Sequence, residues 1–458
     1  MKVMSGLDAR FLYSATPTAH MHTMKVVVVD VSGRIGPLTP ELIGLYLSDR
    51  LDRMPMLRRR VLPVLKGLGN PAVIDDPHFD LTRHIKTATL DPPGGQRELD
   101  GVIGEIASHP LPLDRPLWEL TVVDGLASGC VAFVMKLHHA IADGVASAAM
   151  LQNAFVVDAD EAVIEHYHPS GVPTRREKAE SSAKSAGRAL RLVPRVTRET
   201  WAGAREARRI RHRTTAPLTG PFRGPRTPFN VALTADRTFA TLALPLSEVM
   251  SVKSAAGVTF NDTFLALCGG AIRRYLQRLG PVPVRSLIAS VPMATRTDRH
   301  RLGGNHVDNL FVPLCTDIVD PTERARVVNE STIAARKVRE AFGPELFELR
   351  SGLVPAGFHG VLPRLWGATH LADHVRPPLN VIASCVRGPG RVLELEGGVV
   401  SSLFSCGPIL EGIGLNITAW SYVDSMFVSF LGCSASLPDP SLLAGDMRAE
   451  LDAWIAQS

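Results

Sequence analysis

Two adjacent histidines at the end of an apolar run are the residues of this sequence best suited to chemistry. His138 and His139 close "VAFVMKLHH" (131–139), and Asp143 and Gly144 follow in "AIADG". A histidine has an ordinary pKa of about 6.5, so it can accept a proton near neutral pH as a general base. Neighbouring side chains of a strand point to opposite faces, so only one of the two rings can reach a given reaction centre. The pattern predicts one catalytic histidine at a strand end, with Asp143 capping the helix that follows and Gly144 permitting the tight turn.

Other chemistries lack their usual residues. In a helix, His139 and Asp143 would share a face and could hold a metal, but the β-branched run before them disfavours a helix, and no H-E-x-x-H or C-x-x-C motif adds ligands. No G-x-S-x-G elbow implies an acyl-enzyme, and no Walker A loop or complete G-x-G-x-x-G implies phosphoryl or hydride transfer. What remains is direct attack of a deprotonated alcohol on an activated acyl carbonyl. A purely structural histidine pair is the alternative.

The elements that would position this turn alternate between strand and helix patterns. β-Branched runs predict strands at 25–31, 117–126 and 130–139. Apolar spacing predicts a helix over 39–54, with Thr39 as its N-cap. The later part of the chain continues the alternation, with a strand and helix within 239–257, a helix at 259–280, a strand at 286–295, a helix at 320–342, and strands within 395–409 and 421–433. This alternation is typical of α/β domains.

Length and composition predict two such domains. The chain has 458 residues, 45% hydrophobic and 21% charged, which is more than one ordinary core would organise. We expect domains at 1–165 and 220–458 joined by a linker at 166–219. No signal-peptide pattern and no apolar run long enough to span a bilayer are visible. The six cysteines lack paired spacing, which favours reduced thiols and a cytoplasmic location.

The linker carries the excess positive charge. Residues 175–213 hold thirteen Lys/Arg and four Glu, a net charge of +9, whereas the whole chain has +5. One interpretation is a solvated, partly helical linker. Another is a basic face that binds anionic lipid headgroups, since each Lys or Arg near such a surface contributes about 1 kcal/mol. Nucleic acid is not predicted as a partner, because aromatic residues are sparse and no nucleic-acid-binding motif is present.

The motifs together resemble one enzyme family. "HHAIADG" (138–144) is similar to the HHxxxDG signature of acyl-CoA-dependent acyltransferases with the fold of chloramphenicol acetyltransferase and peptide-synthetase condensation domains. More narrowly, the chain resembles the bacterial wax ester synthase/diacylglycerol acyltransferase family. Further matching segments run nearly end to end: "SGLDARFL" (5–12), "DDPHFDLTRHI" (75–85), "RPLWEL" (115–120), "NDTFLA" (261–266), "SVPMATR" (290–296), "GGNHVDNLFVPL" (303–314) and "NVIASCVRGPG" (380–390). In the last segment, Cys385 and Arg387 replace the family's usual Asn and Pro.

The resemblance implies a fold and a reaction. The fold would be two chloramphenicol acetyltransferase-like α/β domains, with mixed sheets flanked by helices and an active-site tunnel at their interface. The reaction would join an acyl-CoA to diacylglycerol, or to a long-chain alcohol, giving triacylglycerol or wax ester and free CoA without a cofactor or metal. His139 would be the general base, while His138 would face away and orient the motif. The linker would hold the protein peripherally on the inner membrane face or on lipid droplets.

The resemblance also suggests secondary site residues. Asp143 would hold the turn, paired with Arg296, and Gly144 and Arg296 would border the substrate. Trp118 would pack in the core or border the acyl channel, Asn261 and Asp262 would cap a helix or shape the acceptor side, and Ser384 could donate to the developing oxyanion. Two alternatives to this enzyme are a condensation-type acyltransferase that uses a carrier protein and a non-catalytic lipid-binding homologue. The oligomeric state and the preferred acceptor do not follow from the sequence.

Overall fold

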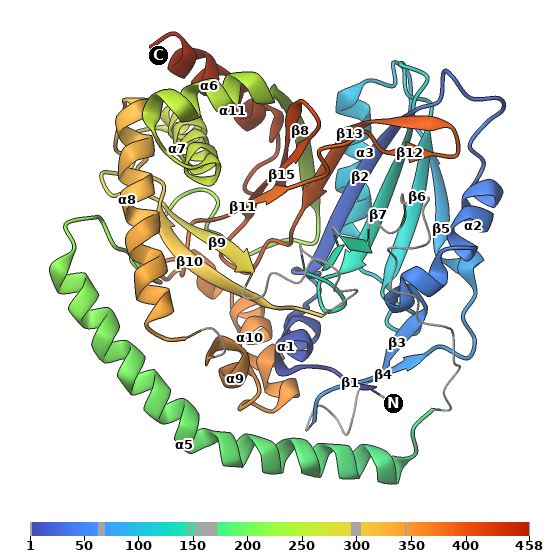
Figure 1. Ribbon diagram of the computed structural model, residues 1–458, viewed down its shortest axis with the longest axis horizontal. Helices are drawn as coiled ribbons and strands as arrows, with labels where there is room; N and C mark the ends of the chain where they lie inside the picture. The colour runs from blue at the N-terminus through green and yellow to red at the C-terminus, as the bar shows by residue number, and fades with distance from the viewer. Residues whose placement is uncertain are drawn as a thin grey trace.

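Two six-stranded mixed sheets, each with its own core, form the body of the protein (Figure 1). The computed structural model describes residues 2–62, 69–143, 146–147, 149–150, 154, 172–294, 304–343 and 346–457. Within these residues, six free cysteines are present and none forms a disulfide.

The N-terminal sheet is almost entirely antiparallel; only β5 and β6 pair in parallel. Its strands lie in the order β12 (Glu394–Leu395), β13 (Gly398–Cys406), β2 (His22–Asp30), β7 (Val131–His138), β6 (Trp118–Asp124) and β5 (Ile85–Thr89). β12 and β13 come from the C-terminal half of the chain. Figure 1 shows these two orange strands beside the blue β2. The predicted division at 1–165 and 220–458 stays a prediction, but 394–406 belong to the first sheet.

The C-terminal sheet has a parallel centre and antiparallel edges, because β11 pairs in parallel with β9 and β14. Its order is β10 (Val307–Pro313), β9 (Ile288–Ala294), β11 (Val381–Arg387), β14 (Leu415–Tyr422), β15 (Ser425–Cys433) and β8 (Arg237–Pro245). A third, small sheet is formed by β1 (Lys2–Val3), β4 (Ala72–Asp75) and β3 (Arg59–Leu62).

Helices flank the sheets. They are α1 (Gly6–Ser14), α2 (Pro40–Ser48), α3 (Gln96–Ser108), α5 (Arg175–Arg213), α6 (Leu246–Ala256), α7 (Phe260–Leu279), α8 (Pro321–Glu340), α9 (Leu346–Ser351), α10 (Val361–Ala368) and α11 (Ser441–Ile455). Short 3-10 turns are η1 (Leu51–Arg53), η2 (Pro55–Arg58), η4 (Leu81–Arg83), η6 (Ala356–Gly360) and η7 (Leu371–Asp373). Within the described residues, no single helix has the length and apolar composition to cross a membrane; α6 and α7 meet those criteria only as a pair bent by 99°.

The predicted strands and helices are present, with two differences in extent. The helix predicted over 39–54 ends at Ser48 and gives way to the 3-10 turns η1 and η2; Pro55 disfavours helical backbone at Met54, the last residue of the predicted range. The linker, expected to be only partly helical, is one helix from Arg175 to Arg213. It begins with a capping box in which Thr174 and Glu177 exchange hydrogen bonds.

The helix α5 runs along the edge of the molecule and connects the two lobes (Figure 1). It is drawn as two straight halves that meet at a bend, and Pro194 stands near the middle of its sequence. Proline removes a backbone hydrogen bond and clashes with the preceding turn, which accounts for the bend.

Candidate active site

The two histidines lie where β7 ends, and they point to opposite faces of the N-terminal sheet. His138 pairs with His22 of β2, and the backbone N–H of His139 donates to the carbonyl of Met21 at 2.8 Å, one step beyond the strand. Strand alternation places His139 on the face that also carries Met135 and its partner Lys25. The two rings are therefore separated by the sheet, as the sequence predicted.

His138 contacts the backbone of the turn that follows it. It is buried, and its Nδ1 accepts a hydrogen bond from the Ala140 N–H at 3.1 Å. Burial, followed by the charge of His139, lowers its pKa to about 3, so the ring stays neutral at physiological pH. Its ring lies edge-on to that of His22, with 6.2 Å between centroids. Among the described residues, no group of three or more His, Cys, Asp or Glu side chains could hold a metal ion.

His139 is half-buried and is held by residues from both halves of the chain. The ring of Phe11 on α1 stacks on it, with centroids 4.3 Å apart and planes at 23°. The side-chain amide of Asn305 donates to the carbonyl of His139 at 2.8 Å and to Oδ1 of Asp8 at 2.7 Å. Ser5 caps α1 and also donates to Asp8. The ring and its backbone are thus fixed together.

Electrostatics keep this imidazole neutral. Burial lowers the pKa of His139 below its ordinary value, the carboxylate of Asp143 raises it, and the ammonium of Lys25 lowers it. The hydrogen bond from Asn305 also raises the pKa of His139. A neutral imidazole is the form that can accept a proton.

Asp143 holds the turn in two directions. It is fully buried; its Oδ1 accepts from the Ala146 N–H at 2.9 Å, which is the helix cap predicted from the sequence. Its Oδ2 accepts from the His306 N–H at 2.9 Å, and Ala142 bridges to Gly304. The motif is therefore joined to a segment 160 residues away, which its sequence did not predict. Gly144 and Arg296, both predicted near the substrate, lie outside the described residues.

Lys25 is a buried cation on the His139 face, and sequence reasoning missed it. Its ammonium donates to the hydroxyl of Ser405 on β13 and lies 4.4 Å from the ring centroid of Trp420 on β14. No carboxylate in the described part of the chain forms an ion pair with it, and burial lowers its pKa to about 8. In the sequence, Lys25 is only the first residue of the predicted strand "KVVVVDV". Its contacts with Ser405 and Trp420 form only when the strands of the two sheets assemble.

Trp118 and Ser384 lie in different environments. Trp118 is fully buried, donates to the carbonyl of Leu57, and stacks on His84 with centroids 4.4 Å apart. These contacts are those of a core residue. Ser384 is half-buried on β11 and shares a face with Val386, which packs against the N-terminal core. Ser384 is thus turned toward the N-terminal lobe.

Asn261 and Asp262 do not cap their helix. The N-cap of α7 is Thr259, whose hydroxyl accepts from the Asp262 N–H at 3.2 Å. Asp262 is buried and also accepts from Asn329 of α8 at 2.7 Å, so it links two helices of the C-terminal lobe. The sequence placed the cap two residues too late because Asn and Asp are themselves favoured capping residues.

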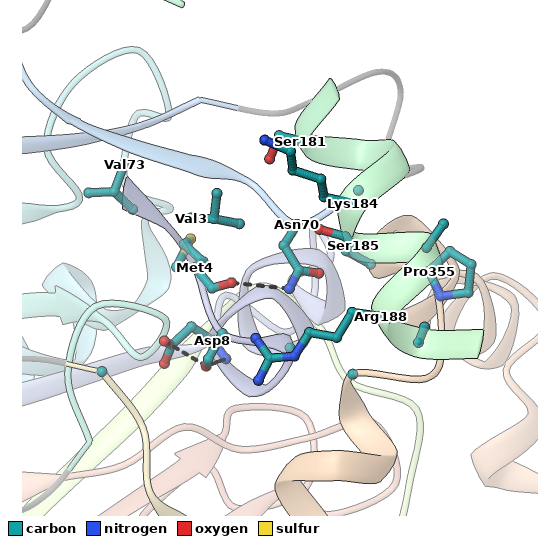
Figure 2. A pocket seen from close by; sticks show the side chains of 18 of the residues that line it. Val3, Met4, Asp8, Asn70, Val73, Ser181, Lys184, Ser185, Arg188 and Pro355 are labelled. Carbon is teal, nitrogen blue, oxygen red and sulfur yellow. Dashed lines mark hydrogen bonds between the residues drawn. The ribbon is translucent and has the colours of Figure 1, made fainter. Parts of the chain in front are cut away.

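A cavity of about 940 Å³ opens beside the histidine motif. Ala140 and Gly304 line it, together with β1, the start of α1, α5 and residues 349–356. Figure 2 shows Lys184, Ser185 and Arg188 of α5 on one side, with Asp8 of α1 across from them and Pro355 near the helix. The cavity therefore reaches Ala140, the residue next to His139, and its volume is large enough for a substrate.

Comparisons with known proteins agree with these features. A family model described as the wax ester synthase/diacylglycerol acyltransferase catalytic domain matches residues 4–264, and the C-terminal domain model of the same family matches 303–454. The chain is 36% identical over 451 residues to Rv0221 of Mycobacterium tuberculosis, a provisionally named diacylglycerol O-acyltransferase, covering 98% of this chain and 95% of the relative. Rv1760 from the same organism, with a similar provisional name, is 33% identical, covering 96% and 87%.

Solved structures confirm the predicted two-lobed α/β fold. A wax ester synthase/diacylglycerol acyltransferase from Marinobacter aquaeolei superposes with a TM-score of 0.71 at 22% identity, covering 100% of this chain and 99% of that one. The starter condensation domain of rhizomide synthetase, solved with C8-CoA, gives a TM-score of 0.56 at 13% identity, covering 99% and 94%. At identities of 22% and 13%, the two structures show a shared fold and nothing more.

Proposed function

Because the chain belongs to the wax ester synthase/diacylglycerol acyltransferase family, we propose that it transfers a fatty acyl group from acyl-CoA to the hydroxyl of diacylglycerol or a long-chain alcohol, with His139 as general base. The products are triacylglycerol or wax ester and free CoA. The observation that carries the proposal is the neutral, half-buried ring of His139, held at a strand end beside the cavity.

The reaction balances with one base and no cofactor. The ring of His139 accepts the hydroxyl proton, and the alcohol oxygen attacks the thioester carbonyl. The resulting intermediate releases the CoA sulfur, which receives the proton back from His139. Acid–base help of this kind supplies about 10²–10⁴-fold in rate, and fixed positioning of the two substrates supplies much of the rest.

The remaining site residues receive roles that fit their surroundings. We assign Ser384, turned toward the N-terminal lobe, to hydrogen bonding of the developing oxyanion. Asp143 keeps His139 in register and raises its pKa, and His138 fixes the turn. Trp118 and Asp262 support the framework of each lobe.

Replacing His139 with Ala tests the proposal. We expect a loss of about 10²–10⁴-fold in ester formation with an unchanged circular dichroism spectrum, whereas His109→Ala, at an exposed position, should keep full activity. A His139→Ala enzyme with normal turnover would contradict the assigned base.

Offering the acyl group on CoA and on a carrier protein in parallel separates this enzyme from a condensation-type acyltransferase. A competition among diacylglycerol, hexadecanol and short alcohols identifies the preferred acceptor.

We further propose that α5 binds anionic lipid headgroups peripherally. Its exposed arginines include Arg205, Arg208 and Arg209, and the side chains of Leu190 and Trp201 are exposed on the same helix. Replacing the arginines of 205–213 with Gln should weaken binding to vesicles containing phosphatidylglycerol, most clearly at low salt. A control that replaces the exposed Arg285 and Arg391, on other elements, should bind normally. Unchanged binding of the α5 variant would reject this contact.

A further inference from the structure

The segment from Val354 to Leu371 exposes a row of large apolar side chains. Their exposed fractions run from 36% for Leu371 to 64% for Leu362; the row comprises Val354, Phe358, Val361, Leu362, Leu365 and Leu371. Four of them, which we call the outer stripe, follow the i, i+3, i+4, i+7 spacing of one helix face: Phe358, Val361, Leu362 and Leu365. Such a stripe ordinarily faces a protein core, yet α10 has no buried residue.

Packing on α1 fixes the outward orientation of this stripe. Ala356 and Gly360 are buried on the inner side of η6. A Cβ atom on Gly360 would collide with the carbonyl oxygen of Tyr13, so the 3-10 turn lies directly against α1. The same helix carries Phe11, which stacks on His139. The segment that carries the stripe and the proposed base therefore both contact α1, and Figure 1 shows α1 beside α10.

The exposed charged side chains within residues 354–376 are cationic. Arg364 and Arg376 are exposed, as are His370 and His374. The only acidic residue between 354 and 376 is Asp373, whose carboxylate accepts from the backbone N–H of Ala232 at 2.8 Å and lies 3.5 Å from Nδ1 of His370. From another segment, the partly buried carboxylate of Glu411 packs against Gly367 of α10. An apolar stripe bordered by cations is complementary to a phospholipid surface with anionic headgroups.

The stripe is also continuous with the cavity beside the histidine motif. Val354, Pro355 and Ala356 line that cavity, and Ala140 and Gly304 line it too. Figure 2 shows Pro355 beside α5 at this cavity. A lipid that left a surface in contact with the stripe would therefore meet a cavity that reaches the residue next to His139.

We propose that the outer stripe inserts into the surface of a phospholipid bilayer and that the adjoining cavity admits the acceptor lipid from this bilayer to His139. The inference rests on the proposed function and adds that the acceptor lipid is taken from a bilayer. It differs from headgroup binding by α5, because insertion of apolar side chains persists at high salt and on uncharged phosphatidylcholine, whereas attraction of arginines does not.

A triple variant of the outer stripe tests the proposal: Phe358→Ser, Leu362→Ser and Leu365→Ser. The matched control is Ile35→Ser, Val284→Ser and Val319→Ser, which removes three apolar side chains from other surfaces, each more exposed than those of the stripe. Because all six side chains are exposed, both variants should fold, and circular dichroism checks this. Cosedimentation with phosphatidylcholine vesicles, with and without phosphatidylglycerol, measures binding at low and high salt.

We expect the stripe variant to bind both kinds of vesicle about tenfold or more weakly, since partial burial of three apolar side chains is lost. Activity on vesicle-borne diacylglycerol should fall in parallel, while activity on dissolved butanol with the same acyl-CoA should be unchanged. The control should match the wild type in all assays. Vesicle binding unchanged in the stripe variant, or equal loss on both acceptors, would overturn the proposal. So would a wild-type dimer that the stripe variant dissociates, because a second copy would then occupy the stripe.

Failure of the proposed function gives a different result. If the wild type formed no ester from either acceptor, the acyltransfer assignment would fail, while cosedimentation would still decide whether the stripe binds a bilayer.

Discussion

At His139, two charges of opposite sign act on the same imidazole. The carboxylate of Asp143 raises the pKa of His139 and the ammonium of Lys25 lowers it, while burial lowers it most. The base is active in its neutral form, so the rate should fall when the pH drops through this lowered pKa. The acid limb of kcat/KM therefore lies below about pH 6.5, the ordinary pKa of histidine.

Replacing Lys25 with Met should move this limb to higher pH. The substitution removes a positive charge that opposes protonation of His139, so the pKa of the ring rises. The pH profile of kcat/KM measures the shift. Lys86→Met removes a cation that pairs with Glu119 instead, and its profile should match the wild type. A limb that moved to lower pH in Lys25→Met would contradict this account.

At the scale of elements, the histidine motif is held by three segments that are distant in the sequence. The end of β7 is joined to α1 by Phe11 and by the hydrogen bonds of Asn305, and to residues 304–306 by Asp143. Asn305 is buried, and its amide connects Asp8 to the backbone of His139. One side chain thus links both lobes at the site.

Asn305→Ala should lower both stability and turnover. It removes the donor to the carbonyl of His139 and to Oδ1 of Asp8, whose Oδ2 keeps the hydrogen bond from Ser5. This loss costs about 1–3 kcal/mol of unfolding free energy. kcat should fall more than KM rises, because the position of the base changes while the cavity remains. Urea unfolding and steady-state kinetics measure both effects. Asn70→Ala, which removes one hydrogen bond to the carbonyl of Met4, should cost less and leave kcat intact. Equal effects of the two variants would show that the link to His139 has no special role.

At the scale of the whole molecule, the lobes share strands as well as a linker. β13 crosses from the C-terminal half to pair with β2, next to β7, and its Ser405 contacts Lys25. Separation of the lobes would break the hydrogen bonds between β13 and β2. The N-terminal core accordingly includes Trp420 and Phe427 from the C-terminal sheet.

Acid should destabilise the fold through its buried histidines. Asp100 acts in the opposite direction, because burial raises its pKa to about 6 and the folded state then binds its proton first. Burial lowers the pKa of His20, His22, His84, His138 and His139, so at these five positions the unfolded chain binds more protons than the folded one below about pH 6.5. Stability is therefore present above this pH and is lost as the pH falls. For His138, with a folded pKa of about 3, the loss between pH 6.5 and 5 is about 2 kcal/mol.

Denaturant unfolding at pH 7 and pH 5 measures this loss. His138→Asn retains a side-chain acceptor but has no titrating ring, so its stability should depend less on pH than that of the wild type. A wild type equally stable at both pH values would contradict the assignment of neutral buried histidines.

The sequence by itself determined those features that depend on neighbours along the chain. Strand alternation sent His138 and His139 to opposite faces, and short-range capping placed Asp143 at the start of the next helix. The same local rules predicted the alternation of strands and helices and, through the ordered motifs, the family. They were less accurate for the N-cap of α7, because Thr and Asp are both favoured capping residues and both occur there. The cap is Thr259 and not Asp262.

Only the tertiary structure decided what surrounds the base. Phe11, Lys25 and Asn305 approach His139 from segments far apart in the sequence, and no local pattern encodes such a meeting. The strand β13 joins the opposite lobe for the same reason, since pairing partners are chosen by the fold. The apolar spacing of η6 and α10 is typical of a helix that packs on a core. In the structure, packing of η6 against α1 leaves these apolar side chains exposed.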